Sequence, residues 1–346
     1  MSTELPVLTK KDFQSDQEVR WCPGCGDYAI LKSVQMVLPQ LGIPKERFVV
    51  VSGIGCSSRF PYYMDTFGFH SIHGRAPAIA TGLKTARPDL DVWVATGDGD
   101  AMSIGGNHLI HLLRRNVGVK VLMFNNRIYG LTKGQYSPTS EHGKRTKSTP
   151  LGSVDTPFNP LALALGAGAT FVARSVDIFQ KHLQQTLLRA AEHRGTAFVE
   201  IYQNCNIFND KAFAYMTEKG ARDDGTLYLE DGQPLIYGAG RSRGIRWNGM
   251  QFETFEIGTD GGKEDCVVWD SSLESPTLAF LMAHMLPPSF PTPIGVLREV
   301  DQPSYEEEVV AQIQHEIDRD GPGQLEKLLY SGDVWTVGGD GESAGA

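Results

Sequence analysis

Two short polar motifs have the residue types of a metal site. The first, Gly97–Gly99 (GDG), follows an apolar run, and the second is the pair Asn125–Asn126, whose later residue lies 28 positions after Asp98. Asp98 offers a carboxylate oxygen, Asn126 an amide oxygen and Ile128 a backbone carbonyl, and such hard ligands suit Mg²⁺, which keeps water and phosphate oxygens as its others. Glycine lets the backbone approach a diphosphate closely. Either motif alone is typical of a turn, but the combination predicts a Mg²⁺–diphosphate site.

Cysteine provides a second candidate site. Cys22 and Cys25 form a CxxC motif, Cys56 follows the first apolar run of the domain, and Cys205 follows a later one. Four thiolates brought together would bind an iron–sulfur cluster or Zn²⁺, whereas CxxC alone also serves as a redox pair. Taken singly, Cys56 and Cys205 are equally well interpreted as buried thiols. Cys266 lies on an apolar run, and we interpret it as a buried bystander.

Histidine and lysine near these motifs are candidates for proton transfer or substrate binding. His70 and His73 have the His-x-x-His spacing of a metal pair, but imidazole favours softer ions than Mg²⁺. They are either hydrogen-bonded loop residues or polar groups beside the substrate, where a neutral imidazole can handle protons near neutral pH. Lys133 and Gln135 either face a substrate carboxylate or belong to a solvated loop.

The elements that position these residues have the pattern of a doubly wound α/β fold. Runs that are apolar on both faces alternate with helical patterns, which predicts a mostly parallel sheet covered on each side. Ligands bind such sheets beyond the carboxyl ends of the strands, where the polar motifs occur. We expect strands at 48–51, 91–96, 117–124 and 197–202, and helices at 76–86, 105–115 and 178–193.

The sequence changes in texture after Asp210. We expect a first domain at 1–210, with the CxxC motif in an N-terminal loop, and an irregular extension at 211–346. Within the extension, helices are expected at 304–319 and 324–329. The Gly-, Ser- and Ala-rich segment 338–346 is expected to be disordered.

Composition excludes several classes of protein. A net charge of −9 argues against nucleic acid as a partner, and the short basic segment Lys144–Lys147 is typical of a solvated loop. No apolar run reaches the roughly 20 residues needed to cross a bilayer, and Met1–Gln17 lacks the pattern of an export signal. We therefore expect a cytoplasmic protein without membrane contact.

Taken in order, the motifs resemble a known family. GDG followed by NN resembles the thiamine-diphosphate signature of the transketolase and 2-oxoacid decarboxylase superfamily, over about Gly97–Thr132. From about Pro6 to Asp210 the chain resembles the β subunit of 2-oxoacid:ferredoxin oxidoreductases, and the 2-oxoglutarate type most. The segments that carry this resemblance are WCPGCGDYAIL (21–31), SGIGCSSR (52–59), HSIHGRAPAIATGLK (70–84), GDGDAMSIGGNH (97–108) and NNRIYGLTKGQYSPTS (125–140).

The resemblance implies three cofactors and assigns residues to them. It favours one 4Fe–4S cluster over zinc, because a cluster beside thiamine diphosphate has a task as electron acceptor. Candidate catalytic residues are His70, His73 and Lys133. Mg²⁺ would be held by Asp98, Asn126 and the Ile128 carbonyl, and the cluster by Cys22, Cys25, Cys56 and Cys205. Thiamine diphosphate would contact Gly55, Cys56, Ser57, His73, Gly97, Asp98, Gly99, Asp100, Asn126, Ile128, Leu131 and Thr132.

The implied reaction is the reversible, coenzyme A-dependent oxidative decarboxylation of 2-oxoglutarate to succinyl-CoA and CO₂, with electrons passed to ferredoxin. Alternatives are pyruvate or a branched-chain 2-oxoacid as substrate, or a non-catalytic electron-transfer module, which would not need a diphosphate site. In this family the glutamate that activates thiamine comes from the α subunit, and no segment here resembles its pyrimidine-binding domain. The chain is thus expected to be half an active site within an α₂β₂ enzyme.

Overall fold

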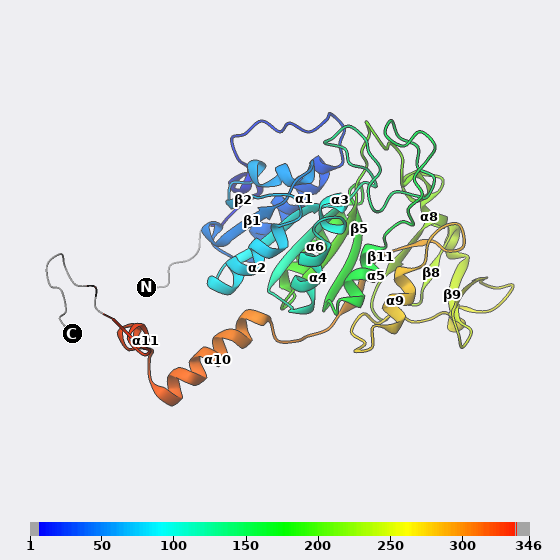
Figure 1. The fold of residues 1–346 in the computed structure, drawn as a ribbon. Helices are drawn as coiled ribbons and strands as arrows, with labels where there is room; N and C mark the ends of the chain where they lie inside the picture. Colours follow the sequence, from blue (N-terminus) through cyan, green and yellow to red (C-terminus); the bar gives the residue numbers. More distant parts are fainter. Residues whose placement is uncertain (1–6, 336, 338–346) are drawn as a thin grey trace. The chain divides into compact units, whose positions relative to one another are not determined.

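A computed structural model describes residues 7–335 and 337 of the chain. Its centre is an eight-stranded sheet in the order β2-β1-β3-β4-β6-β5-β11-β7, parallel throughout except where β11 runs antiparallel to β5 (Figure 1). The strands are β1 (Phe48–Ser52), β2 (Phe67–His70), β3 (Asp91–Gly97), β4 (Val119–Asn125), β5 (Phe171–Val176), β6 (Ala197–Tyr202), β7 (Thr226–Leu229) and β11 (Thr292–Glu299).

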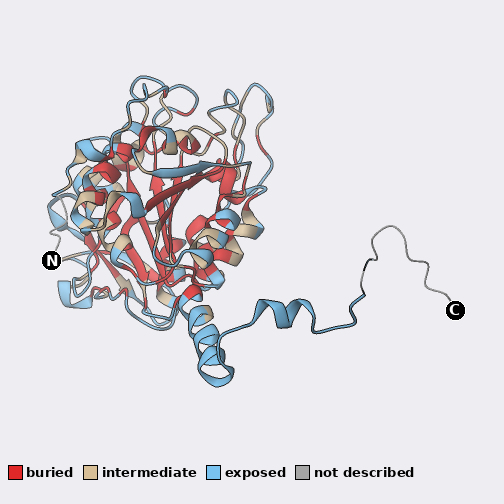
Figure 2. Ribbon diagram, turned by 90° about the vertical axis from the view of Figure 1, so that its left-hand side faces the viewer, coloured by how far each residue is buried: buried red, intermediate tan, exposed pale blue. Residues whose placement is uncertain are grey.

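Helices cover both faces of this sheet, which explains why its central strands are apolar on both sides. Every residue of β4, β5 and β6 is buried, and Figure 2 shows these strands enclosed between helices whose outer surfaces are exposed. One core lies under α2 (Ala76–Ala86), α4 (Gly106–Arg114), α5 (Pro160–Gly166) and α9 (Thr277–Ala283). The other lies under α1 (Asp27–Val37) and α6 (Gln180–Glu192).

These observations confirm the expected fold class. The four expected strands and three expected helices are present, with bounds that differ by at most about two residues. The sequence analysis missed α1, β2, the short helix α3 (Asp98–Met102), α5 and β5. It also missed two strands beyond Asp210, because β7 and β11 join the main sheet instead of belonging only to an irregular extension.

The rest of the chain after Asp210 forms small elements. Two short helices, α7 (Ala214–Thr217) and α8 (Arg222–Gly225), precede an antiparallel sheet of β8 (Ile236–Tyr237), β9 (Arg243–Trp247) and β10 (Phe252–Glu256). The compact units are residues 1–306 and 307–346, so their division does not coincide with the expected boundary at Asp210. The expected late helices are present as α10 (Tyr305–Asp320) and α11 (Leu325–Leu329). The disorder expected at 338–346 lies outside the described residues. Among the described helices, none is both long and apolar enough to cross a membrane.

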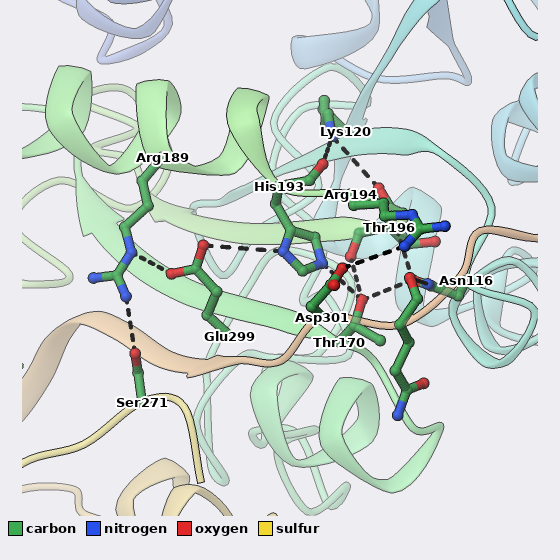
Figure 3. Close-up of polar contacts among 12 residues, drawn as sticks. Asn116, Lys120, Thr170, Arg189, His193, Arg194, Thr196, Ser271, Glu299 and Asp301 are labelled. Atoms are coloured by element: carbon green, nitrogen blue, oxygen red, sulfur yellow. Dashed lines mark hydrogen bonds and ion pairs between the residues drawn. The ribbon is translucent and has the colours of Figure 1, made fainter. Parts of the chain in front are cut away.

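Asn116 links three segments through hydrogen bonds at the edge of the sheet opposite the polar motifs (Figure 3). The side-chain oxygen of Asn116 accepts hydrogen bonds from the Thr170 hydroxyl at 2.7 Å and from the Thr196 backbone N–H at 2.9 Å. Its amide nitrogen donates to the Pro303 carbonyl at 3.0 Å. The residue is buried at φ 52°, a left-handed conformation that asparagine tolerates better than most residues. Asn116 thereby joins the starts of β5 and β6 to the segment after β11.

Replacing Asn116 by leucine is therefore expected to destabilise the protein by about 2–4 kcal/mol, because buried polar groups of three segments lose their partner. Urea unfolding followed by circular dichroism measures the change. Lys181→Leu, at an exposed position of α6, should change the free energy of unfolding by less than about 0.5 kcal/mol. Equal stability of the two variants would show that Asn116 does not have this role.

Candidate active site

The polar motifs lie together at the carboxyl ends of neighbouring parallel strands. β1, β3, β4 and β6 end side by side at Ser52, Gly97, Asn125 and Tyr202. A cavity of about 140 Å³ opens at this edge. Its wall includes every residue expected to contact thiamine diphosphate, from Gly55, Cys56 and Ser57 through His73 and Gly97–Asp100 to Asn126, Ile128, Leu131 and Thr132. Their individual roles are taken up as proposals below.

Asp98 is one of the carboxylates that line this cavity. It follows the last residue of β3 and begins the short helix α3 (Asp98–Met102), and only 2% of its surface is exposed. The hydroxyls of Ser137 and Thr139 both donate to its Oδ2, at 2.5 and 2.6 Å, so neither occupies Oδ1. Burial raises the pKa of Asp98 to about 6, although the two hydroxyls act in the opposite direction. A buried carboxylate of this kind needs a cation to stabilise its charge.

The two asparagines at the end of β4 have different surroundings and hydrogen-bond partners. Asn126 lines the cavity, where its Oδ1 accepts from the Ile128 N–H at 3.1 Å and its Nδ2 donates to Gln203 at 2.8 Å. Asn125 is buried, and its amide donates to Glu200 at 2.7 Å instead. The pair thus places one amide oxygen beside the cavity and anchors the loop with the other residue.

His73 and Asp100 also line the cavity. His73 Nδ1 lies 2.5 Å from Asp100 Oδ1, which also accepts from the Gly74 N–H at 2.7 Å. Asp100 Oδ2 accepts from the Thr96 hydroxyl at 2.7 Å. Asp100 thereby fixes the position of the imidazole. His70 is not brought to this cavity but lines a neighbouring one of about 410 Å³.

Tyr129 is a cavity residue that the sequence analysis missed. Its hydroxyl donates to the Gly99 carbonyl at 3.1 Å, and its ring would lie 2.1 Å from a Cβ atom added at Gly99. Glycine at 99 is therefore required by close packing against an aromatic ring. The serine and threonine that bond to Asp98 were also missed. Their signal is the polar segment SPTS (137–140), which lies within a motif already singled out.

The cysteines gather around a second cavity. Cys22, Cys25, Cys56 and Cys205 all line this space of about 200 Å³, and Lys133 lies in its wall too. Its wall shares Asp27, Cys56, Asn126, Gly130 and Leu131 with the wall of the first cavity, so the two adjoin. The thiols surround a space instead of meeting at a point. Among the described residues, no group of three or more His, Cys, Asp or Glu side chains could hold a single metal ion.

Two of these thiols are held in a partly buried environment. Burial raises the pKa of the Cys56 thiol to about 12, and it raises that of Cys25 as well. All five cysteines are free, and Cys266 is buried away from this cavity, beside Phe255.

Asp27 joins the two cavities and was not expected from the sequence. Only 1% of its surface is exposed, and neither carboxylate oxygen has a hydrogen-bond partner among the described residues. Burial raises the pKa of this carboxyl to about 7. Its only sequence signal is its position directly after the CPGCG segment.

Two further predicted residues lie at the margin. Lys133 is exposed at φ 76° beside the cysteine cavity. Gln135 accepts a hydrogen bond from the Thr132 hydroxyl at 2.5 Å, which stabilises the loop that both belong to.

Comparison with known proteins defines the class first. Residues 53–201 match the model of the C-terminal TPP-binding domain of thiamine pyrophosphate enzymes. This range contains the whole cavity around Asp98 except Asp27, so the cavity lies in a domain of the thiamine pyrophosphate enzyme type.

Individual relatives define the family. The chain is 52% identical over 330 residues to 2-oxoglutarate oxidoreductase subunit KorB of Mycobacterium tuberculosis, covering 94% of this chain and 88% of the relative. It is 43% identical to 2-oxoglutarate synthase subunit KorB of Archaeoglobus fulgidus, over 54% of this chain and 69% of the relative. The chain belongs to the β subunits of 2-oxoacid:ferredoxin oxidoreductases, which confirms the family and enzyme class that its motifs indicate.

A solved structure agrees with this assignment. It is the 2-oxoglutarate:ferredoxin oxidoreductase from Magnetococcus marinus with 2-oxoglutarate, coenzyme A and succinyl-CoA bound. The TM-score is 0.76 at 33% identity, and the match covers 96% of this chain and 98% of that one.

Proposed function

We propose that this chain is the β subunit of a cytoplasmic 2-oxoglutarate:ferredoxin oxidoreductase. The reaction converts 2-oxoglutarate and coenzyme A to succinyl-CoA and CO₂, and it transfers two electrons to ferredoxin; it is reversible. The observation that carries the proposal is the adjacency of the Asp98 cavity and the four-cysteine cavity, which share part of one wall. An oxidative decarboxylase needs its electron acceptor close to the reacting cofactor.

The first cavity fits thiamine diphosphate with Mg²⁺. Asp98, the Asn126 amide oxygen and the Ile128 carbonyl are the hard oxygen donors that this ion prefers, and the buried Asp98 carboxylate needs a cation. When bound, thiamine diphosphate supplies the carbanion chemistry of decarboxylation. The chain holds the diphosphate end, shields it from water, and fixes the His73 imidazole beside it through Asp100.

The second cavity fits a 4Fe–4S cluster better than zinc. Cysteine thiolates are the usual ligands of such clusters, and four of them surround the space. Zinc would require the sulfurs to meet within about 2.3 Å of one point, whereas the described thiols do not form a single-ion site. When bound, a cluster accepts electrons one at a time. The chain contributes the four ligands and, through Gly130, a wall without a side chain between Cys56 and Cys205.

Cationic residues favour a dicarboxylate substrate. Arg59 and Arg20 line both the cysteine cavity and the neighbouring cavity that contains His70, although Arg20 is paired with Glu18 at 2.8 Å. A second carboxylate, which 2-oxoglutarate has and pyruvate lacks, would find charge-assisted hydrogen bonds there. The relatives that carry 2-oxoglutarate in their names agree with this choice.

The chain supplies only part of the catalytic machinery. The acidic residues that line the Asp98 cavity are Asp27, Asp98 and Asp100, and no glutamate is among the described residues of its wall. The glutamate that activates thiamine would therefore come from the α subunit. We place the chain in an α₂β₂ enzyme, with ferredoxin as its electron partner.

Metal analysis tests the cluster. Anaerobically purified complex is expected to contain about four iron and four sulfide per β chain, as one 4Fe–4S cluster requires. Cys205→Ser should lose most of this iron, because it removes one of the ligands, while Cys266→Ser is the matched control and should keep it. Zinc in place of iron, or equal iron in both variants, would contradict the assignment.

A further inference from the structure

A further cavity, separate from the Asp98 and cysteine cavities, lies beside Asn125 and Arg127. Its volume is about 330 Å³. It shares no lining residue with the cavity around Asp98. The site proposed for thiamine diphosphate therefore does not account for it.

A buried ion pair lines this cavity, and both oxygens of its carboxylate accept hydrogen bonds. Arg174 and Glu200 are 1% and 0% exposed, and the Arg174 Nε donates to Glu200 Oε2 at 2.6 Å. Glu200 Oε1 accepts from Asn125 at 2.7 Å, so both carboxylate oxygens have partners. Of the two terminal nitrogens of Arg174, Nη1 donates to the Pro293 carbonyl at 3.4 Å. Nη2 has no acceptor among the described residues and is not one of their fully buried unpaired atoms, so it keeps contact with solvent. A guanidinium donor in a cavity wall favours a ligand that accepts hydrogen bonds.

A second guanidinium lies beside the same ring. Arg127 lies 5.5 Å from the centre of the Tyr202 ring and 4.7 Å from that of Phe213, and Arg174 lies 4.9 Å from the Tyr202 ring. Arg127 forms no ion pair with a carboxylate of the described chain. Its backbone is at φ 55°, a strained left-handed conformation for arginine. Glu200 and Glu141, which line the same cavity, interact with the Arg127 charge without forming an ion pair with it. Arg127 thus brings a second guanidinium to the cavity.

The remaining wall is largely apolar. Pro157, Phe158, Pro160, Leu286 and Pro287 face the space. Glu141 also lines it, but this carboxylate is paired with Lys144 at 2.9 Å. Apolar walls with a few converging polar groups are typical of small-molecule sites. The geometry points to a second ligand site, which binds a small molecule through a carboxylate or phosphate group held by Arg127 and Arg174.

Ligand binding at this site is expected to change the affinity for the cofactor. Asn125 lines the cavity, and its Oδ1 lies 2.9 Å from the Thr139 hydroxyl, which also lies 2.6 Å from Asp98 Oδ2. The single proton of this hydroxyl is shared between the two acceptors. A ligand that draws Arg127 or Asn125 toward itself changes the supports of the Mg²⁺-binding loop. The site is thus placed to regulate cofactor affinity.

Calorimetry on the α/β complex tests the proposal. The complex is first saturated with thiamine diphosphate and Mg²⁺, so that anions do not enter the Asp98 cavity, and is then titrated with inorganic phosphate and, separately, with malonate. We expect saturable binding of at least one anion, with one site per β chain, and the better ligand identifies the group that is recognised. Arg127→Gln should weaken this binding at least tenfold, whereas Arg145→Gln, in the exposed loop nearby, should leave it unchanged.

A second variant pair guards against misfolding of the Arg127 variant. Leu286 is 39% exposed in the cavity wall, so Leu286→Glu adds a negative charge where a polar side chain is tolerated. It should also weaken anion binding at least tenfold, and Leu286→Gln should not. No saturable binding of either anion, or binding that neither Arg127→Gln nor Leu286→Glu weakens, would overturn the proposal.

Discussion

Replacing Asp98 by alanine is expected to abolish retention of thiamine diphosphate and Mg²⁺ and to lower turnover of the complex by at least about a thousandfold. Asp98 is the one anionic ligand in the proposed Mg²⁺ site, and the two amide-type oxygens that remain bind Mg²⁺ weakly. Cofactor content after gel filtration, measured by thiochrome fluorescence, reports the loss directly. Asp270→Ala, at an exposed position, is the control and should retain the cofactor fully.

The fold should survive this substitution. In the cofactor-free protein, burial raises the pKa of Asp98 from about 3.8 to about 6. A carboxyl whose folded pKa lies above its unfolded value weakens folding as the pH rises through that window. Cofactor-free wild-type protein should therefore lose stability between about pH 4 and pH 6 relative to the variant. A variant that is unfolded, or one that retains full cofactor occupancy, would contradict this account of Asp98.

The second large effect concerns the part of the active site that we propose the α subunit supplies. The isolated chain is expected to bind thiamine diphosphate weakly and to show no turnover above background with 2-oxoglutarate and coenzyme A. The aminopyrimidine end would face water, without an apolar cover and without the carboxylate that promotes carbanion formation. Reduction of a viologen dye measures turnover, and addition of the α subunit should restore it.

The control for this comparison is the same preparation with its cluster intact. Iron content and the absorbance near 400 nm should match between the isolated chain and the complex, so that loss of activity is not loss of the cluster. Turnover by the chain alone at the rate of the complex would show that these 346 residues contain the whole active site. The missing carboxylate would then have to lie outside the cavity wall described above.

Local patterns in the sequence predicted the elements that position the site. Strands such as β4 and β6 are mostly apolar runs, each with one internal charged residue, and polar residues follow them, so their bounds and their shared edge followed from the pattern. The strand β5 (FVARSV) was missed because Arg174 and Ser175 shorten its apolar run to three residues, and the Arg174 charge pairs with Glu200 on the neighbouring strand. That pairing depends on tertiary contact and leaves no local signal.

The residues of the candidate site likewise divide into those that have a local sequence motif and those that do not. Asp98, Asn126 and the CxxC cysteines lie in motifs with their own spacing, which a single sequence can reveal. Asp27 was missed together with α1, the helix that it begins. Its burial between two cavities depends on how α1 packs against the sheet edge.

The most direct test of the central claim is a spectrum. The anaerobic α/β complex, without ferredoxin, is mixed with 2-oxoglutarate and then with coenzyme A while the absorbance near 400 nm is followed. The account predicts iron–sulfur absorbance that bleaches on addition of substrate in wild-type protein and does not bleach in the Asp98→Ala complex. A complex without that absorbance, or one that bleaches equally after Asp98→Ala, would contradict the claim that the two adjoining cavities hold thiamine diphosphate and its electron acceptor.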